Sequence, residues 1–387
     1  MRHRKYQKSH KWLTFELDLA KASYRLWLAL GEARSKCAHI AGVPLKPNVA
    51  VELRQVYLSK GVQATTAIEG NTLSEEQVRA RVDRQLELPL SREYLGREID
   101  NVLAALQDIW DNSDGGTVSP KQLFDWNRTV LSGLEVEPPA VPGRPREHEV
   151  TVGRYLGAPP DDLDYLLAKL CDFVNEPWSK GQLDRVTAGI LKAITAHLYL
   201  AWIHPFGDGN GRTARLLEFK ILTAAGVPDV AAHVLTNHYN LTRSEYYRQL
   251  DAASKSGGDV FPFVEYAVQG FVDGLTEQIN RIQGQQLELA WRDYVHEMLP
   301  DSGGKGLTRQ RHLLLDMPIG KRFPTLSALA NVSGRVATDY GQLTRTTLQR
   351  DVAKLLDEHL LIQEEQGFMV NISKILAFQP ETTNFEV

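Results

Sequence analysis

The sequence lacks the features that mark secreted and membrane-spanning proteins. Only two of its 387 residues are cysteines, Cys37 and Cys171, which are too few and too far apart to indicate a disulfide framework. No segment approaches the roughly 18 consecutive apolar residues of a membrane-spanning helix. The basic first residues, MRHRKYQKSHK, lead into an amphipathic pattern and not into the apolar region of a signal peptide. We therefore expect a cytoplasmic protein that makes no membrane contact.

An excess of charge of one sign is also missing. Lysine and arginine number 44 against 48 aspartates and glutamates, which gives a formal net charge of −4. This balance provides no general attraction to nucleic acid, so any such contact must come from a local patch. The composition, 43% hydrophobic and 24% charged, is typical of an ordinary globular protein.

Strand patterns are scarce, and helical periodicity covers most of the chain. The one convincing alternation is REHEVTVGRYLG, where Val150 and Val152 flank Thr151 between segments rich in glycine and proline. The sequence therefore predicts a mainly α fold with one short β-hairpin that lies as a flap on a helical body.

The length indicates two or three domains. We expect an N-terminal helical region over 1–110, a helical core over 111–278, a linker helix over 279–304 and a small domain over 305–387. The boundary near 280–305 is predicted because the chain there becomes polar and then rich in glycine. Three short helices and a final β-wing are expected beyond it.

The stretch HPFGDGNGRTAR, residues 204–215, joins two apolar helical patterns and carries unusual chemistry. Gly209 and Gly211 directly precede a helix, where free backbone amides and glycine allow a bulky anion to approach. Arg212 and Arg215 lie three residues apart in the first turn of that helix, where cations oppose the helix dipole. An anion is therefore expected beside them.

Two further residues of this stretch extend the chemistry. Asp208 offers a hard oxygen ligand, which suffices for Mg²⁺ when a nucleotide supplies phosphate oxygens and water the rest. His204 ends the preceding helix and could take a proton from a hydroxyl near neutral pH. An anion nest, a metal ligand, a cationic clamp and a base together indicate phosphoryl-type transfer.

Other interpretations of the stretch fit less well. A Walker loop needs a lysine and a preceding strand, and the glycine spacing does not match a dinucleotide fingerprint. A zinc site would have only His197 and His204 nearby. A plain turn needs neither two arginines nor an aspartate. Phe206 alone is best explained as an aromatic plug that holds the loop against the core.

Residues 204–215 resemble the signature of the Fic family, His-Pro-Phe-x-Asp/Glu-Gly-Asn-Gly-Arg-x-x-Arg, at every fixed position. The resemblance extends over roughly residues 45–275 and implies a Fic-type helical bundle. It also implies a protein adenylyltransferase, which moves AMP from ATP to a Ser, Thr or Tyr hydroxyl of a protein, with itself included among the candidate targets. AMP transfer, as opposed to another phosphate chemistry, follows only from the resemblance.

The resemblance assigns roles to particular residues. His204 would be the general base, and Asp208 would hold Mg²⁺. The residues expected to bind ATP are Gly209, Asn210, Gly211, Arg212, Arg215, Tyr246 and Tyr247, the two tyrosines on the adenine side. The segment with Val150, Thr151 and Val152 would be the flap that pins the target by strand addition.

Self-inhibited members of the family carry Ser/Thr-x-x-x-Glu-Gly/Asn, which Thr65, Glu69 and Gly70 match. Glu69 is expected at the C-terminus of a helix that begins near Pro47, where a carboxylate opposes the dipole. We hypothesise that Glu69 pairs with Arg215 and withdraws it from the γ-phosphate. The alternative is a plain helix end with a solvated Glu69. Some inhibited relatives also remove AMP, so a bifunctional enzyme is a further alternative.

The last segment suggests a second kind of function. TRTTLQRDVAKLLDEHLLI resembles the recognition helix of a winged helix, with QEEQGFMVNI as its wing. Such a domain could bind DNA through Arg345 and Arg350, or could dock a protein or form a homodimer. The alternative to an enzyme is therefore a DNA-binding regulator whose Fic domain senses nucleotide or modifies itself. The basic residues of 305–354 are Lys305, Arg309, Arg311, Lys321, Arg322, Arg335, Arg345, Arg350 and Lys354.

Overall fold

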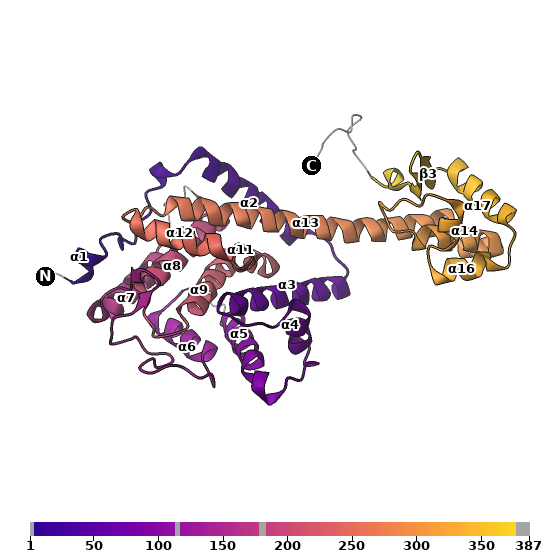
Figure 1. The fold of residues 1–387 in the computed structure, drawn as a ribbon. Helices are drawn as coiled ribbons and strands as arrows, with labels where there is room; N and C mark the ends of the chain where they lie inside the picture. Colours follow the sequence, from indigo (N-terminus) through magenta and orange to yellow (C-terminus); the bar gives the residue numbers. More distant parts are fainter. Residues whose placement is uncertain (1–3, 113–116, 178–182, 377–387) are drawn as a thin grey trace. The chain divides into compact units, whose positions relative to one another are not determined.

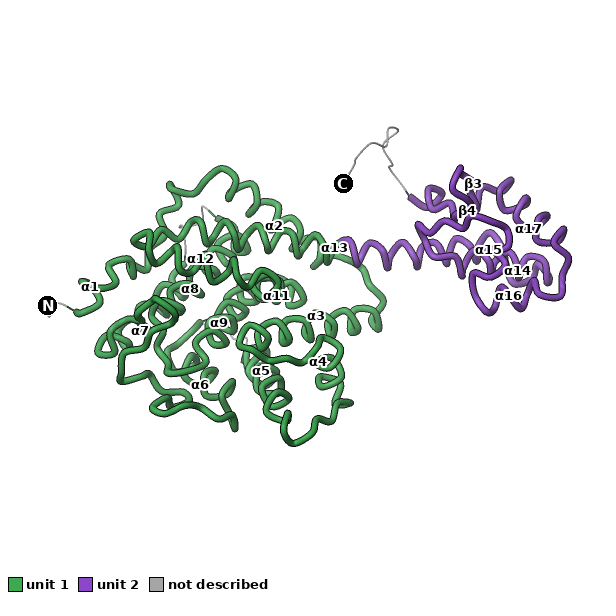
Figure 2. Tube along the Cα trace, viewed as in Figure 1, with its two compact units in different colours: residues 1–279 green, residues 280–387 purple. Residues whose placement is uncertain are grey.

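The computed structural model describes residues 4–112, 117–177 and 183–376. The outer ends of the first and last predicted domains, 1–3 and 377–387, lie outside these residues. The chain divides into two compact units, 1–279 and 280–387 (Figure 2). The division falls within the long helix α13 (Phe261–Met298), so one continuous helix belongs to both units.

Helices α8 (Arg185–Ile203) and α9 (Asn210–Ala224) form the core of the first unit (Figure 1). Ile190, Leu191 and Ile194 are fully buried on α8, as its apolar periodicity predicts. By length and composition α8 is apolar enough to cross a membrane, but 78% of that window is buried by the rest of the unit. Helices packed on this pair include α2 (Tyr24–Gly42), α3 (Pro47–Ile68), α5 (Glu93–Asp111), α6 (Pro120–Val130), α7 (Leu163–Asn175) and α10 (Asp229–Ala232).

The predicted helix that begins at Pro47 is α3 (Pro47–Ile68), which ends on Glu69 and a left-handed Gly70 with φ +105°. A Cβ on Gly61 would overlap the ring of His233, so glycine allows the close packing of α3 on this part of the chain. The remaining helices of the unit are α1 (Tyr6–Ser9), α4 (Glu75–Val82), α11 (Val234–Leu241) and α12 (Arg243–Lys255).

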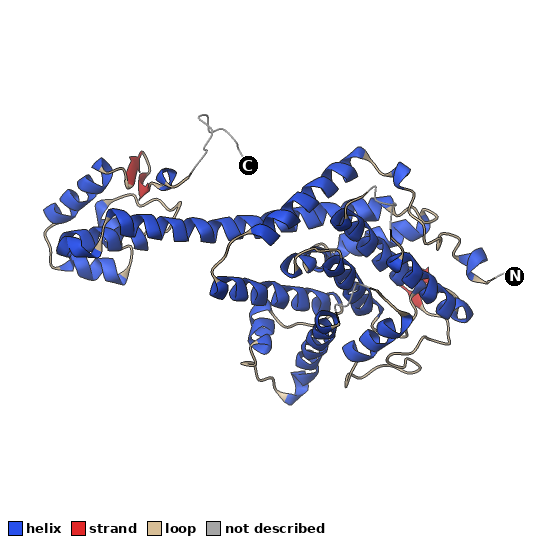
Figure 3. Cartoon of the chain, turned by 180° about the vertical axis from the view of Figure 1, so that it is seen from behind, coloured by secondary structure: helices blue, strands red, loops and turns tan. Residues whose placement is uncertain are grey.

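The hairpin is shorter than the sequence predicts. Strands β1 (Thr151–Val152) and β2 (Tyr155–Leu156) are antiparallel, with Thr151 opposite Leu156 and Val152 opposite Tyr155 (Figure 3). Val150 lies outside the strand, but its carbonyl accepts the Gly157 amide at 3.0 Å. Gly153, with φ +61°, makes the tight turn possible.

The second unit has its own core, to which α13 contributes Trp291 and Val295. Residues 279–304 are therefore not a bare linker, because part of them packs inside this unit. A helix that the sequence analysis missed, α16, begins where Ser333 caps the Val336 amide at 3.1 Å. The elements are α14 (Gly304–Asp316), α15 (Leu326–Ala330), α16 (Gly334–Gly341), α17 (Arg345–Asp357), β3 (Leu361–Glu364) and β4 (Gly367–Val370).

Candidate active site

The loop between α8 and α9 reverses the direction of the chain, and two of its residues adopt the left-handed backbone conformation that this requires. His204 closes α8 with φ +48°, and Gly209 opens α9 with φ +75°. Arg146, which is buried, donates from Nε to the His204 carbonyl at 2.8 Å and from Nη2 to the Ala158 carbonyl at 2.5 Å. Arg146 therefore ties the loop to the base of the hairpin, a role that the sequence analysis did not assign to it.

The His204 imidazole is available as a base. Its Nδ1 lies 3.3 Å from the Ala201 carbonyl, which can only accept, so Nδ1 carries the proton and Nε2 the lone pair. Burial lowers the pKa of His204 to about 4. The ring is consequently neutral at physiological pH, the form that can take a proton from a hydroxyl.

Asp208 combines a fixed backbone with an accessible carboxylate. Its carbonyl accepts from Asn127 Nδ2 at 2.9 Å, while its side chain is 45% exposed. A Cβ on Gly209 would come within 2.8 Å of that Asn127 nitrogen, which explains the need for glycine there. Among the described residues, no group of three or more acidic, histidine or cysteine side chains is arranged so that it could hold a metal ion by itself. Asp208 therefore fits Mg²⁺ only where phosphates and water complete the ion's coordination.

The Asn210 side chain is engaged within the loop. Its Oδ1 accepts from the Phe206 amide and its Nδ2 donates to the Phe206 carbonyl, both at 2.9 Å. Phe206 is buried against Phe124, as expected for a plug. In this structure the Asn210 amide shapes the loop, so phosphate binding by its side chain stays a prediction.

The contact predicted between Glu69 and Arg215 is present. Arg215 Nη2 donates to Glu69 Oε1 at 2.6 Å, and Arg215 Nε donates to Thr65 Oγ1 at 2.7 Å. Burial would raise the pKa of Glu69, but the Arg215 guanidinium outweighs it and holds that pKa below its usual range. Gly211 is required beside the pair because a Cβ there would overlap the Glu69 carboxylate.

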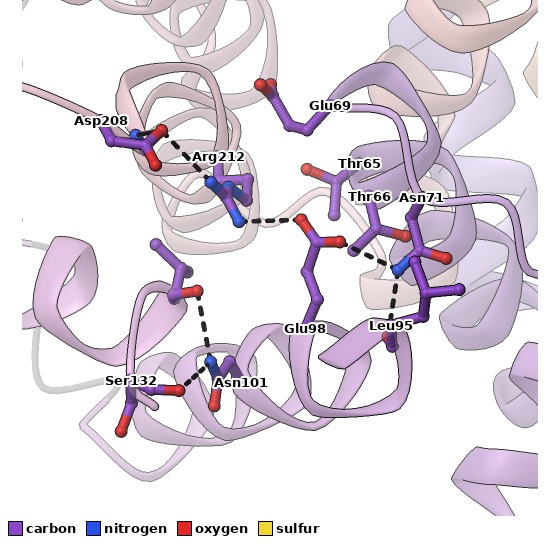
Figure 4. Close-up of polar contacts among 12 residues, drawn as sticks. Thr65, Thr66, Glu69, Asn71, Leu95, Glu98, Asn101, Ser132, Asp208 and Arg212 are labelled. Carbon is purple, nitrogen blue, oxygen red and sulfur yellow. Dashed lines mark hydrogen bonds and ion pairs between the residues drawn. The ribbon is translucent and has the colours of Figure 1, made fainter. Parts of the chain in front are cut away.

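Arg212 pairs with a carboxylate that the sequence analysis did not single out. Its Nη1 donates to Glu98 Oε1 on α5 at 2.8 Å, and its Nη2 lies 3.4 Å from Asp208 Oδ1. Figure 4 shows the Glu98 carboxylate between Arg212 and Asn71. Burial raises the pKa of Glu98, with Arg212 acting in the opposite direction.

The comparisons with known proteins agree with this geometry. Residues 117–222 match the model of the Fic/DOC family, a range that includes Asn127, Arg146 and the whole loop. Residues 117–222 therefore resemble a Fic/DOC domain. The chain's mainly helical fold with a short hairpin is the expected Fic-type architecture.

Two curated relatives of this chain are named protein adenylyltransferase fic-1. The one from Caenorhabditis briggsae is 32% identical over 239 residues, which cover 59% of this chain and 44% of the relative. The one from Caenorhabditis elegans is 34% identical over 211 residues, which cover 54% and 38%. The match spans less than half the length of either relative.

Solved Fic structures share the fold. A fragment of Fic-1 from C. elegans superposes with a TM-score of 0.56 at 27% identity, covering 67% of this chain and 73% of that chain. A Fic family protein from Desulfovibrio desulfuricans G20 has a TM-score of 0.57 and covers 91% and 94%. Its identity is 21%, so it shows the fold alone.

A cleft of about 630 Å³ brings some of the predicted site residues together, whereas Asp208, Gly209 and Arg212 are not in its lining. His204, Asn210, Gly211 and Arg215 line it. The hairpin contributes Val152, Gly153, Arg154 and Tyr155 to the lining of the cleft. The volume lies in the range of small-molecule sites.

The two tyrosines predicted on the adenine side differ in this cleft. Tyr246 is 3% exposed and its hydroxyl lies 2.9 Å from His197 Nε2, so it forms a fixed wall. Tyr247 is 45% exposed and its hydroxyl donates to the Ile68 carbonyl at 3.4 Å, which places it beside the end of α3. Adenine contact by either ring stays a prediction.

Proposed function

We propose that this chain is a protein adenylyltransferase that moves AMP from ATP to a serine, threonine or tyrosine hydroxyl of a protein. The observation that carries the proposal is the neutral His204 imidazole in a cleft whose wall includes Gly211 and Arg215 of α9. The names of the curated relatives support the same activity.

The proposed reaction is a displacement at the α-phosphorus of ATP. His204 Nε2 takes the proton of the target hydroxyl as its oxygen forms a bond to the α-phosphorus, and the bond to the leaving pyrophosphate breaks. Asp208 would hold Mg²⁺, which when bound neutralises phosphate charge. The backbone amides of Gly209 and Gly211, at the N-terminus of α9, would bind phosphate oxygens. The hairpin would hold the target segment by strand addition.

We further propose that Glu69 inhibits the enzyme. Thr65 and Glu69 take up the donors on two nitrogens of Arg215, which is 2% exposed in its side chain. An arginine held in this way is withheld from the γ-phosphate, so ATP would bind in an unproductive pose. Removing the Glu69 carboxylate would free Nη2 of Arg215 for a phosphate. The bond from Nε to Thr65 would still hold the arginine near the site.

Incubation with α-labelled ATP tests both proposals. We expect Glu69→Gly to raise AMP incorporation by at least about tenfold, because a phosphate contact by Arg215 has the worth of a charged hydrogen bond. His204→Ala in that background should lower it by about 10²-fold or more. Glu358→Gly is a matched control, since Glu358 ends α17 in the same αR conformation as Glu69 ends α3.

Two results would contradict these proposals. Unchanged labelling in Glu69→Gly relative to the parent would remove the inhibitory role. Labelling that survives in the Glu69→Gly, His204→Ala double variant would remove His204 as the base. Release of AMP from a labelled protein by the parent enzyme, lost on Glu69→Gly, would favour the bifunctional alternative.

The alternative of a DNA-binding regulator depends on the second unit. Arg345 and Arg350 are exposed on α17 and form no ion pair with other described residues, which favours this alternative. Five other cations of the segment, however, are paired with carboxylates: Arg309, Arg311, Arg322, Arg335 and Lys354. Salt-dependent retention on DNA that is lost in Arg345→Ala, Arg350→Ala would support this function.

A further inference from the structure

One buried carboxylate connects the catalytic loop to the end of the proposed inhibitory helix. Glu98 lies on α5 and is 9% exposed. Its Oε1 accepts from Arg212 Nη1 at 2.8 Å, and its Oε2 accepts from Asn71 Nδ2 at 2.9 Å (Figure 4). Each oxygen therefore holds a different segment of the chain.

Asn71 follows Glu69 by two residues and is fixed by several hydrogen bonds. Its Nδ2 also donates to the Leu95 carbonyl at 3.0 Å, and its Oδ1 accepts from the Leu73 amide at 3.0 Å. Because Oδ1 takes an N–H group, Nδ2 must face Glu98. The Asn71 amide donates to the Thr66 carbonyl at 3.0 Å, which closes the helix end that presents Glu69.

The positive charge of the Arg212 guanidinium is compensated mainly by the Glu98 carboxylate. The guanidinium is nearly buried, and of its two carboxylate contacts the one to Glu98 is the shorter, 2.8 Å against 3.4 Å to Asp208. A buried cation without a close counter-ion is strongly unfavourable, so Glu98 selects the orientation of Arg212. That orientation places Arg212 beside Asp208, where phosphates and Mg²⁺ are proposed to bind.

We propose that Glu98 is a positioning residue for nucleotide binding and for inhibition at once. It orients Arg212 toward the phosphates, and through Asn71 it holds Glu69 against Arg215. Both arginines of the motif are therefore governed from one carboxylate on α5. This inference rests on the proposed function, since it deepens the regulation of the same site.

The chemistry of the amide explains which variants separate the two effects. Glu98→Gln has nearly the same shape, but its NH₂ group must face either Arg212 or Asn71, and both present donors. One of the two contacts is consequently lost, and in either orientation Arg212 loses the negative charge that balances its guanidinium. Asn71→Ala removes the contact between Glu98 and the helix end, together with the bonds of Asn71 to Leu95 and Leu73, and leaves the Arg212 ion pair in place.

The test uses the full chain, in the parent and in the Glu69→Gly background. Asn71→Ala should raise AMP transfer by at least about threefold in the parent, because Glu69 is less firmly held. In the Glu69→Gly background it should change transfer less than twofold. Glu98→Gln in that background should weaken binding of a non-hydrolysable ATP analogue, measured by titration calorimetry, by about tenfold.

Asn101→Ala is the matched control. Asn101 lies one turn further along α5, but its Nδ2 donates to the Ser132 carbonyl at 2.8 Å and to the Val130 carbonyl at 3.3 Å, at the end of α6. It should therefore disturb the packing of α5 without weakening analogue binding. Circular dichroism of each variant establishes that it is folded.

Several outcomes would overturn the inference. One is a rate of AMP transfer in Asn71→Ala that equals the rate of the parent, although Glu69→Gly raises that rate. Another is unchanged analogue affinity in Glu98→Gln, or an equal loss in Asn101→Ala. If Glu69→Gly transfers no AMP, the proposed function fails instead, and the analogue affinities of Glu98→Gln and Asn101→Ala still decide whether Glu98 positions Arg212.

Discussion

At the scale of single residues, burial sets the protonation state of the proposed base. An exposed histidine has a pKa near 6.5 and would be partly charged in the cell. Burial lowers the pKa of His204 to about 4, so the neutral form is complete at neutral pH and is lost only as the pH falls through that value. The hydrogen bond to Ala201 fixes which nitrogen is free.

The pH profile of the Glu69→Gly variant checks this assignment. We expect kcat/KM for AMP transfer to be flat from pH 8 to about 5.5, to fall to half near pH 4, and to approach a tenfold loss per pH unit only below about pH 3. The free-enzyme base controls kcat/KM, so binding of substrate does not shift the expected limb. A decrease to half near pH 6.5 would contradict the assignment of His204 as a buried neutral base.

At the scale of elements, the hairpin is anchored by the start of the chain. His10 is buried, and its Nε2 donates to the Leu156 carbonyl at 2.9 Å. The other residue of β2, Tyr155, donates from its hydroxyl to the Trp202 carbonyl at 2.7 Å. The strands are only two residues long, so these contacts and Arg146 determine where the hairpin lies.

His10→Ala should therefore loosen the hairpin. We expect faster hydrogen exchange of the Gly157 amide, which donates to Val150, because the neighbouring Leu156 carbonyl loses its partner. AMP transfer to a protein target should decrease, while the KM for ATP stays the same. His39→Ala, an exposed histidine on α2, serves as the control. Unchanged exchange at Gly157 would show that His10 does not hold the hairpin.

At the scale of the whole molecule, the two units have separate cores. Leu355 on α17 is fully buried with Val352, Leu329 and Trp291 in the core of the second unit. Units with independent cores are expected to unfold independently unless their interface is large and apolar. The continuous helix α13 is shared between them, but its two parts pack in different cores.

Leu355→Ala measures that independence. Removing a buried leucine side chain costs about 2–5 kcal/mol, so one transition in a calorimetric scan should move to lower temperature. The transition of the first unit should stay in place, and AMP transfer by Glu69→Gly at low temperature should be unchanged. A single transition that shifts as a whole would show that the two units unfold together.

The helices and the loop chemistry could be predicted because they depend on local sequence. Pro47 and Gly70 bound α3 as expected, since both residues restrict the backbone whatever surrounds them. α16 was missed because it is a short helix whose start depends on the single cap at Ser333. The phosphate role predicted for Asn210 was drawn from its place in the motif, whereas its hydrogen bonds to Phe206 depend on how the loop closes.

The sequence by itself determined which groups meet in the loop after α8: a histidine, an aspartate, glycines and two arginines within one turn of a helix. It also placed Glu69 at a helix end, where its charge is unfavourable. Only the tertiary structure decided what these groups contact. Glu98 precedes Arg212 by 114 residues and follows Asn71 by 27, so no local pattern links them. The packing of α5 against α3 and α9 brings them together, and burial makes the loss of either partner of the Glu98–Arg212 ion pair strongly unfavourable.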